Sequence, residues 1–87
     1  MNITLRFFAS VRETLGTSEE TLMLAANDAP ATVGQLRIFL AARGGVWAAA
    51  LLETRVLRTA FNQVMCSADT ALVDGCEVAF FPPVTGG

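Results

Sequence analysis

Residues 32–45 read TVGQLRIFLAARGG, and this stretch predicts the one main helix of the chain. Thr32 at the N-cap and Gln35 three residues later fit a capping box, in which each side chain accepts a hydrogen bond from a backbone N–H near the helix start. Gly44-Gly45 predicts the end of the helix, because glycine readily adopts the left-handed conformation that follows one. The apolar side chains expected on one face of this helix are Val33, Leu36, Phe39 and Leu40.

Strand-like segments lie on both sides of this helix, two before it and two after it. In the first two of them apolar side chains recur at every second position, and in the last one apolar side chains lie on both faces. The four expected strands are residues 3–9, 20–24, 57–63 with Met65, and 76–81. A turn that contains one helical turn is expected at residues 11–16, and a second short helical piece at residues 47–52.

The order strand, strand, helix, strand, strand predicts an α+β domain in which a helix lies across one face of a small mixed sheet. It favours the β-grasp, or ubiquitin-like, architecture, whose first and last strands are parallel neighbours. Phe8 and Phe81 are large apolar side chains on the outer faces of these two strands, so we expect them to lie side by side. Proline has no N–H to donate, so Pro82-Pro83 ends the last strand. The domain would span residues 1–81, and residues 82–87 would form an extended tail.

The composition indicates one folded domain that does not depend on a membrane or a nucleic acid. Of its 87 residues, 53% are hydrophobic and 16% are charged, which is enough to build a core. The longest apolar run, residues 46–52, is far shorter than the roughly 20 residues that cross a bilayer, and the alternating N-terminus does not resemble a signal peptide. A net charge of −2 disfavours binding through phosphates. We therefore expect a cytoplasmic protein.

The side chains offer no evident catalytic group. The chain contains no histidine and no lysine, so it has neither an imidazole base nor an amine for a Schiff base. Cys66 and Cys76 form no CxxC pair and have no histidine near them in sequence, so we expect no metal site and interpret both as small hydrophobic residues. The carboxyl group of Gly87 is the best remaining candidate for chemistry.

The tail suits a carboxyl group that must enter the pocket of another protein. It consists of Pro82, Pro83, Val84, Thr85, Gly86 and Gly87. The two prolines stiffen the exit from the sheet, and the four extended residues after them reach roughly 13 Å. Glycine has no Cβ, so enclosing walls can approach it closely and the terminal carboxyl carbon is unhindered. Activated as an acyl-adenylate, this carboxylate could accept sulfur and become a thiocarboxylate, although a Gly-Gly ending alone also fits a frayed terminus.

Three segments together resemble the small subunits of molybdopterin synthase. Residues 74–87 read DGCEVAFFPPVTGG, residues 5–13 read LRFFASVRE and are followed by Gly16, and residues 60–63 read AFNQ. The resemblance covers nearly the whole chain, and the ending FFPPVTGG is specific where Gly-Gly alone would be weak.

The resemblance implies a β-grasp fold and a defined reaction cycle. An activating enzyme adenylates the terminal glycine, here Gly87, with ATP and magnesium, and a sulfur donor converts the adenylate to a thiocarboxylate. The tail, here residues 82–87, inserts into the large subunit, whose residues catalyse sulfur transfer to cyclic pyranopterin monophosphate. The small subunit has no catalytic residues and no bound cofactor of its own, and two copies of each subunit form a heterotetramer. By position, the docking patch on both partners would include Phe8, Phe81 and Met65.

Three positions depart from this family without touching the tail. Cys76 replaces a usual acidic residue, Phe61 replaces a valine, and Met65 replaces a frequent leucine. If exposed beside its turn, the Cys76 thiol could oxidise. Two other functions remain open. One is a sulfur carrier for thiamine synthesis or tRNA thiolation, and the other is a ubiquitin-like module that binds noncovalently or modifies other proteins. A binding module would tolerate loss of its last two residues, whereas a carrier would not.

Overall fold

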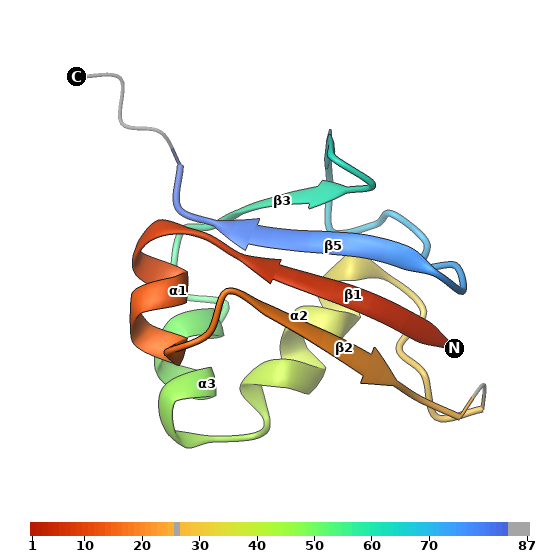
Figure 1. Ribbon diagram of the computed structural model, residues 1–87, viewed down its shortest axis with the longest axis horizontal. Helices are drawn as coiled ribbons and strands as arrows, with labels where there is room; N and C mark the ends of the chain where they lie inside the picture. The colour runs from red at the N-terminus through yellow and green to blue at the C-terminus, as the bar shows by residue number, and fades with distance from the viewer. Residues whose placement is uncertain (26, 84–87) are drawn as a thin grey trace.

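In the computed structural model, which describes residues 1–25 and 27–83, a five-stranded mixed sheet carries three short helices on one face (Figure 1). The strands are β1 (Asn2–Phe7), β2 (Glu19–Met23), β3 (Arg58–Phe61), β4 (Val64–Cys66) and β5 (Cys76–Phe81). The helices are α1 (Ala9–Leu15), α2 (Val33–Ala41) and α3 (Gly45–Leu51).

The strand order is β2-β1-β5-β3-β4, so the first and last strands of the chain lie together in the middle of the sheet. β1 and β5 are parallel, with Ile3 opposite Cys76 and Phe7 opposite Phe80, and all other neighbouring pairs are antiparallel. This arrangement confirms the predicted α+β class and the β-grasp order.

The helical layer is more divided than the sequence predicts. The expected main helix, α2, has nine residues, and α1 and α3 have seven each. α1 is longer than the single turn expected there, and α3 is the predicted second helical piece. No helix in the described part of the chain is long and apolar enough to cross a membrane.

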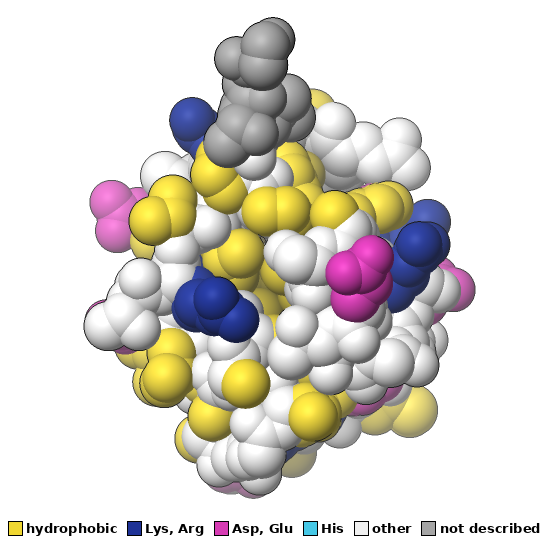
Figure 2. Space-filling model, turned by 90° about the vertical axis from the view of Figure 1, so that its left-hand side faces the viewer, with side chains coloured by type: hydrophobic (Ala, Val, Ile, Leu, Met, Phe, Trp, Pro, Cys, Tyr) yellow, Lys and Arg dark blue, Asp and Glu magenta, His cyan; other side chains and the backbone are white. Residues whose placement is uncertain are grey.

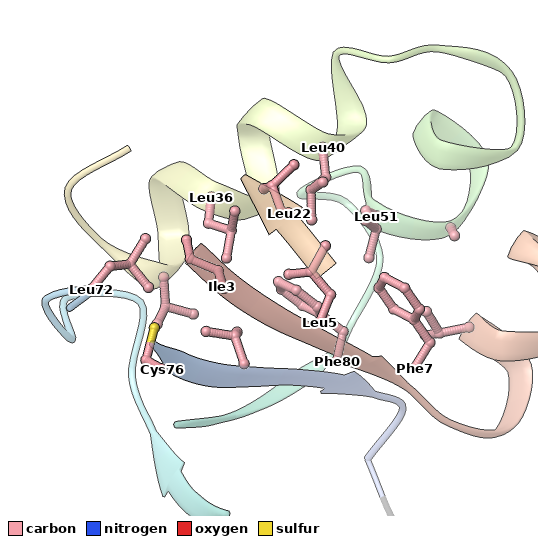
Figure 3. Packing of buried hydrophobic residues seen from close by; sticks show 14 residues of the cluster. Ile3, Leu5, Phe7, Leu22, Leu36, Leu40, Leu51, Leu72, Cys76 and Phe80 are labelled. Atoms are coloured by element: carbon pink, nitrogen blue, oxygen red, sulfur yellow. The ribbon is translucent and has the colours of Figure 1, made fainter. Parts of the chain in front are cut away.

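The core lies between the sheet and the helices (Figure 3). Ile3, Leu5 and Phe7 of β1 point into it, and each is at most 1% exposed. The helices contribute the buried side chains Val33, Leu36, Leu40, Ala50 and Leu51. The Phe7 ring stacks on Phe80 at 6.3 Å between centroids and meets the Trp47 ring edge-on at 5.6 Å. Because side chains alternate along a strand, burying these residues leaves the next ones, Phe8 and Phe81, for the opposite face.

The threonine half of the predicted capping box is present at the start of α2, and the glutamine side chain reaches one residue beyond the N-cap, to Ala31. The Thr32 hydroxyl accepts a hydrogen bond from the Gln35 N–H at 3.2 Å, and the Gln35 side-chain oxygen accepts one from the Ala31 N–H at 2.9 Å. At the other end, Gly44 and Gly45 have φ values of +77° and +54°, which are costly for residues with a Cβ. The two glycines therefore form the corner between α2 and α3.

The apolar face of α2 is narrower than predicted. Leu36 and Leu40 are fully buried, whereas Phe39 is 37% exposed. Phe39 is one residue before Leu40, which turns it by about 100° around the helix axis, to the edge of the buried stripe. The prediction that Phe39 belongs to the core is therefore wrong.

The single strand expected at residues 57–63 is also wrong, because the chain turns back within it. Asn62 and Gln63 have φ values of 48° and 68° and form a two-residue hairpin turn between β3 and β4. Asparagine tolerates this left-handed conformation better than most residues. The Asn62 side-chain oxygen also accepts a hydrogen bond from the Glu77 N–H at 2.8 Å, and its own N–H donates to the Glu77 carbonyl at 2.9 Å. The turn is thus tied to β5.

Arg37 connects α2 to the end of α3. Its Nε donates to the Leu51 carbonyl at 2.7 Å, and its Nη2 donates to the carbonyls of Leu52 and Arg55. The bond to Leu51 satisfies a carbonyl at the end of α3, and the other two bind carbonyls of the segment that follows this helix. Burial lowers the pKa of Arg37, and the carboxylate of Glu53 acts in the opposite direction. Through its three hydrogen bonds, the Arg37 guanidinium holds the segment between α3 and β3 in place.

Candidate functional site

Phe8 and Phe81 lie side by side on the face of the sheet that the helices leave uncovered. Their rings meet edge-on with 6.4 Å between centroids, as the parallel pairing of β1 and β5 predicts. Phe8 is 42% exposed and Phe81 is half-buried. Two aromatic rings on an open sheet face have no structural role in the core, so they are candidates for contact with another protein.

Met65 shares this face. In the pairing register Met65 lies opposite Ala60, Ala60 lies opposite Ala79, and Ala79 lies beside Arg6. Directly paired residues point to the same side of a sheet, so all these side chains share the open face. The two small alanine side chains make the surface shallow between the larger ones. Met65 itself is 56% exposed. We call this set the open-face patch, and it consists of Phe8, Ala60, Met65, Ala79 and Phe81.

Two arginines lie at the rim of the open-face patch. The Arg6 guanidinium is 5.6 Å from the centre of the Phe8 ring, and its Nη1 is 3.7 Å from a Glu77 carboxylate oxygen. Arg58, the first residue of β3, is directly opposite Phe81 in the register and is exposed. Arg6, Arg58, Ala60 and Ala79 were not predicted from the sequence as site residues. Because side chains alternate along β5, Ala79 lies on the same face as Phe81 and could have been predicted from the sequence. The face on which Arg58 and Ala60 lie could be assigned only once the bounds of β3 were known.

The tail leaves the sheet next to the open-face patch. β5 ends at Phe81, and the Phe8 N–H donates to the Phe80 carbonyl at 3.3 Å, so β1 and β5 stay paired up to this point. β5 ends on the side of the sheet where α1 lies (Figure 1), and Pro82, which follows it, lines a hollow together with residues of α1. The remaining tail residues predicted to enter a partner, Val84, Thr85, Gly86 and Gly87, lie outside the described residues, and Pro83 is half-buried.

A hollow lies under the root of the tail. It is lined by residues of α1, of the segment after α3 and by Pro82, among them Val11, Thr14, Arg55 and Leu57. Figure 2 views this end of the molecule and shows apolar side chains in the hollow, with charged ones around it. The surface around Pro82 is thus concave on the helical side and carries the aromatic pair on the sheet side.

The two cysteines do not form a reactive site. Cys76 is 1% exposed and packs in the core opposite Ile3, which agrees with its interpretation as a small hydrophobic residue and does not meet the condition of exposure for oxidation. Side chains alternate between the two faces along β5, and the side chain of Cys76, its first residue, points to the helical face. Cys66 is half-buried, and its thiol is 3.4 Å from the Thr59 hydroxyl. Within residues 1–25 and 27–83, no three His, Cys, Asp or Glu side chains gather where they could bind a metal ion.

Comparison with known proteins gives the same family along the whole chain. Residues 5–87 match the ThiS family. The molybdopterin synthase sulfur carrier subunit of Escherichia coli is 51% identical over 81 residues, which is 93% of this chain and 94% of that protein. The protein of the same name from Haemophilus influenzae is 42% identical over the same shares. A solved complex of subunits 1 and 2 of the molybdopterin-converting factor from Helicobacter pylori contains a chain that matches with a TM-score of 0.66, at 23% identity and full coverage of both chains. At that identity the likeness shows the fold alone.

Proposed function

This chain belongs to the ThiS family, and we propose that it is the sulfur carrier subunit of a molybdopterin synthase. The observation that carries the proposal is its 51% identity, over nearly the full length of both chains, to the Escherichia coli protein of that name. The geometry of the open-face patch supports it, because a partly exposed aromatic pair lies where the tail leaves the sheet. The proposed cycle consumes ATP and takes place in the cytoplasm.

The sulfur travels on the carboxyl group of Gly87. In the first step a carboxylate oxygen attacks the α-phosphate of ATP on a separate activating enzyme, which uses magnesium and releases pyrophosphate. Sulfide released by a sulfur donor then attacks the acyl carbon and displaces AMP, which leaves a thiocarboxylate. In the last step this thiocarboxylate gives its sulfur to cyclic pyranopterin monophosphate, and water restores the carboxylate. Activation is needed because a carboxylate is a poor electrophile.

Catalysis of the transfer belongs to the large subunit. This chain has no histidine and no lysine to act as a base, and its thiols are buried or half-buried. Its own contribution is to bind and to position. The open-face patch docks on the large subunit, and residues 82–87 extend from the dock into the active site of the partner. A heterotetramer of two small and two large subunits is the expected assembly.

Complex formation with the large subunit of molybdopterin synthase from the same organism tests this function. Size-exclusion chromatography with light scattering should give one complex with the mass of two copies of each subunit. The enzyme that accepts sulfur in thiamine synthesis is the matched control, and it should elute separately from this chain. A stable complex with that control enzyme, and none with the large subunit, would replace the proposal with a thiamine-type carrier.

A further inference from the structure

Arg58 lies at the edge of the open-face patch, and its positive charge has no ion-pair partner among the described residues. Its side chain is exposed and, through the register, lies on the same face as Phe81. Among the residues that the structure describes, no carboxylate lies within ion-pair distance of it. By register two carboxylates lie on this face, and both lie on the β1 side of it: Glu19 is opposite Arg6, and Glu77 is opposite Thr4 and 3.7 Å from the Arg6 guanidinium.

Several other arginines have evident structural roles. Arg37 donates to three carbonyls, and Arg55 donates to the Ala49 carbonyl at 2.9 Å. Arg43 forms two hydrogen bonds to the Glu20 carboxylate and lies 4.4 Å from the centre of the Trp47 ring. Arg58 differs from these three because nothing in the described fold requires a cation at its position.

Arg6 adds a second guanidinium on the other side of the aromatic pair. It contacts the Phe8 ring, and its 3.7 Å approach to Glu77 is a loose ion pair between partly exposed side chains. The tail end of the open face therefore carries two guanidinium groups, on β1 and on β3, around Phe8 and Phe81. Arg6 has two carboxylates beside it, Glu77 and its register partner Glu19, whereas Arg58 lies opposite Phe81.

We propose that the docking surface of the large subunit carries a carboxylate opposite Arg58, and that this ion pair beside the aromatic contact selects the correct partner. The inference rests on the proposed function, since it concerns the surface that docks the carrier. A guanidinium presents parallel donors that match both oxygens of a carboxylate. The apolar contact alone would bind many hydrophobic surfaces. A guanidinium beside that contact disfavours a partner surface that leaves the guanidinium unpaired or places another cation opposite it.

Isothermal titration of the large subunit with three variants of the full chain tests the proposal. Arg58→Gln removes the charge, Arg58→Glu reverses it, and Arg43→Gln removes the same charge from the helical side as a matched control. Arg58→Gln should raise Kd about three- to tenfold, and Arg58→Glu should raise it further. The salt dependence of Kd between about 0.05 and 0.5 M should become weaker in Arg58→Gln, because the screened pair is gone. Arg43→Gln should leave both quantities unchanged.

The Phe81→Ala variant separates failure of this inference from failure of the proposed function. If Phe81→Ala weakens binding while Arg58→Gln and Arg58→Glu bind like the unmodified protein at every salt concentration, the patch docks without an ion pair and the inference is wrong. If Arg43→Gln weakens binding as much as Arg58→Gln, the effect comes from net charge and the inference is also wrong. If the unmodified chain itself does not bind the large subunit, the proposed function fails first.

Discussion

A protein with one phenylalanine added after Gly87 should transfer no sulfur. The added residue converts the Gly87 carboxylate into an amide, which cannot be adenylated at that carbon, and it places a bulky side chain where the proposed channel accepts only glycine. The measurement is molybdopterin formation from cyclic pyranopterin monophosphate in a mixture of the activating enzyme, ATP, a sulfur donor and the large subunit. Product should fall to the background of a mixture without the carrier.

Removal of the added residue provides the control. Carboxypeptidase A cleaves a terminal phenylalanine readily and a glycine slowly, so brief digestion regenerates the Gly87 carboxylate. Activity should return after digestion, and the thermal unfolding midpoint should be the same in all three samples. Normal product formation by the undigested, extended protein would contradict the proposed role of Gly87.

Phe81→Ala should weaken docking on the large subunit by about 30-fold or more and leave the isolated fold intact. Aromatic residues at the centre of an interface commonly contribute about 2 kcal/mol or more, which corresponds to that factor. Phe81 is half-buried and lies on the open face, so its loss empties no cavity in the core. Isothermal titration gives the affinity, and thermal unfolding gives the stability.

Phe80→Ala makes the same chemical change one residue earlier. It should lower the stability of the fold, whereas Phe81→Ala should lower the affinity for the large subunit. Phe80 is 0% exposed and stacks on Phe7, so its truncation should cost about 3–5 kcal/mol of folding free energy. The contrast between the neighbours tests whether strand parity separates core from docking surface. Unchanged affinity in both Phe81→Ala and Phe8→Ala would mean that the open-face patch is not the docking site.

The parts of the fold that were predicted correctly are those with strong local signals. The capping box at Thr32 and Gln35 and the double glycine identified α2 and the corner after it. Side-chain alternation along β1 and β5 placed Phe8 and Phe81 on outer faces, and the order of the elements made these strands neighbours. These predictions depend only on residue spacing and on the pairing that the β-grasp order imposes.

The predictions that failed depended on tertiary contacts. The turn at Asn62-Gln63 lacks the glycine that usually marks a tight hairpin, and its asparagine is fixed by bonds to Glu77 in a distant strand. Phe39 was assigned to the core by its spacing, but the width of the buried stripe depends on how closely the sheet and α3 approach α2. Without the β3 boundary, the side of the sheet on which Arg58 lies could not be assigned. That is why the charged rim of the open-face patch became visible only in the structure.

The most direct test of the carrier function is top-down mass spectrometry of the protein after incubation with ATP, its activating enzyme and a sulfur source. Fragment ions must localise the change, because replacing oxygen by sulfur adds almost the same mass as oxidising one of the three methionines. We predict a mass increase on the fragments that contain Gly87 and on no fragment that ends before it. With an activating enzyme shown to be competent on another carrier, an unmodified Gly87 would contradict the account and favour a ubiquitin-like binding module.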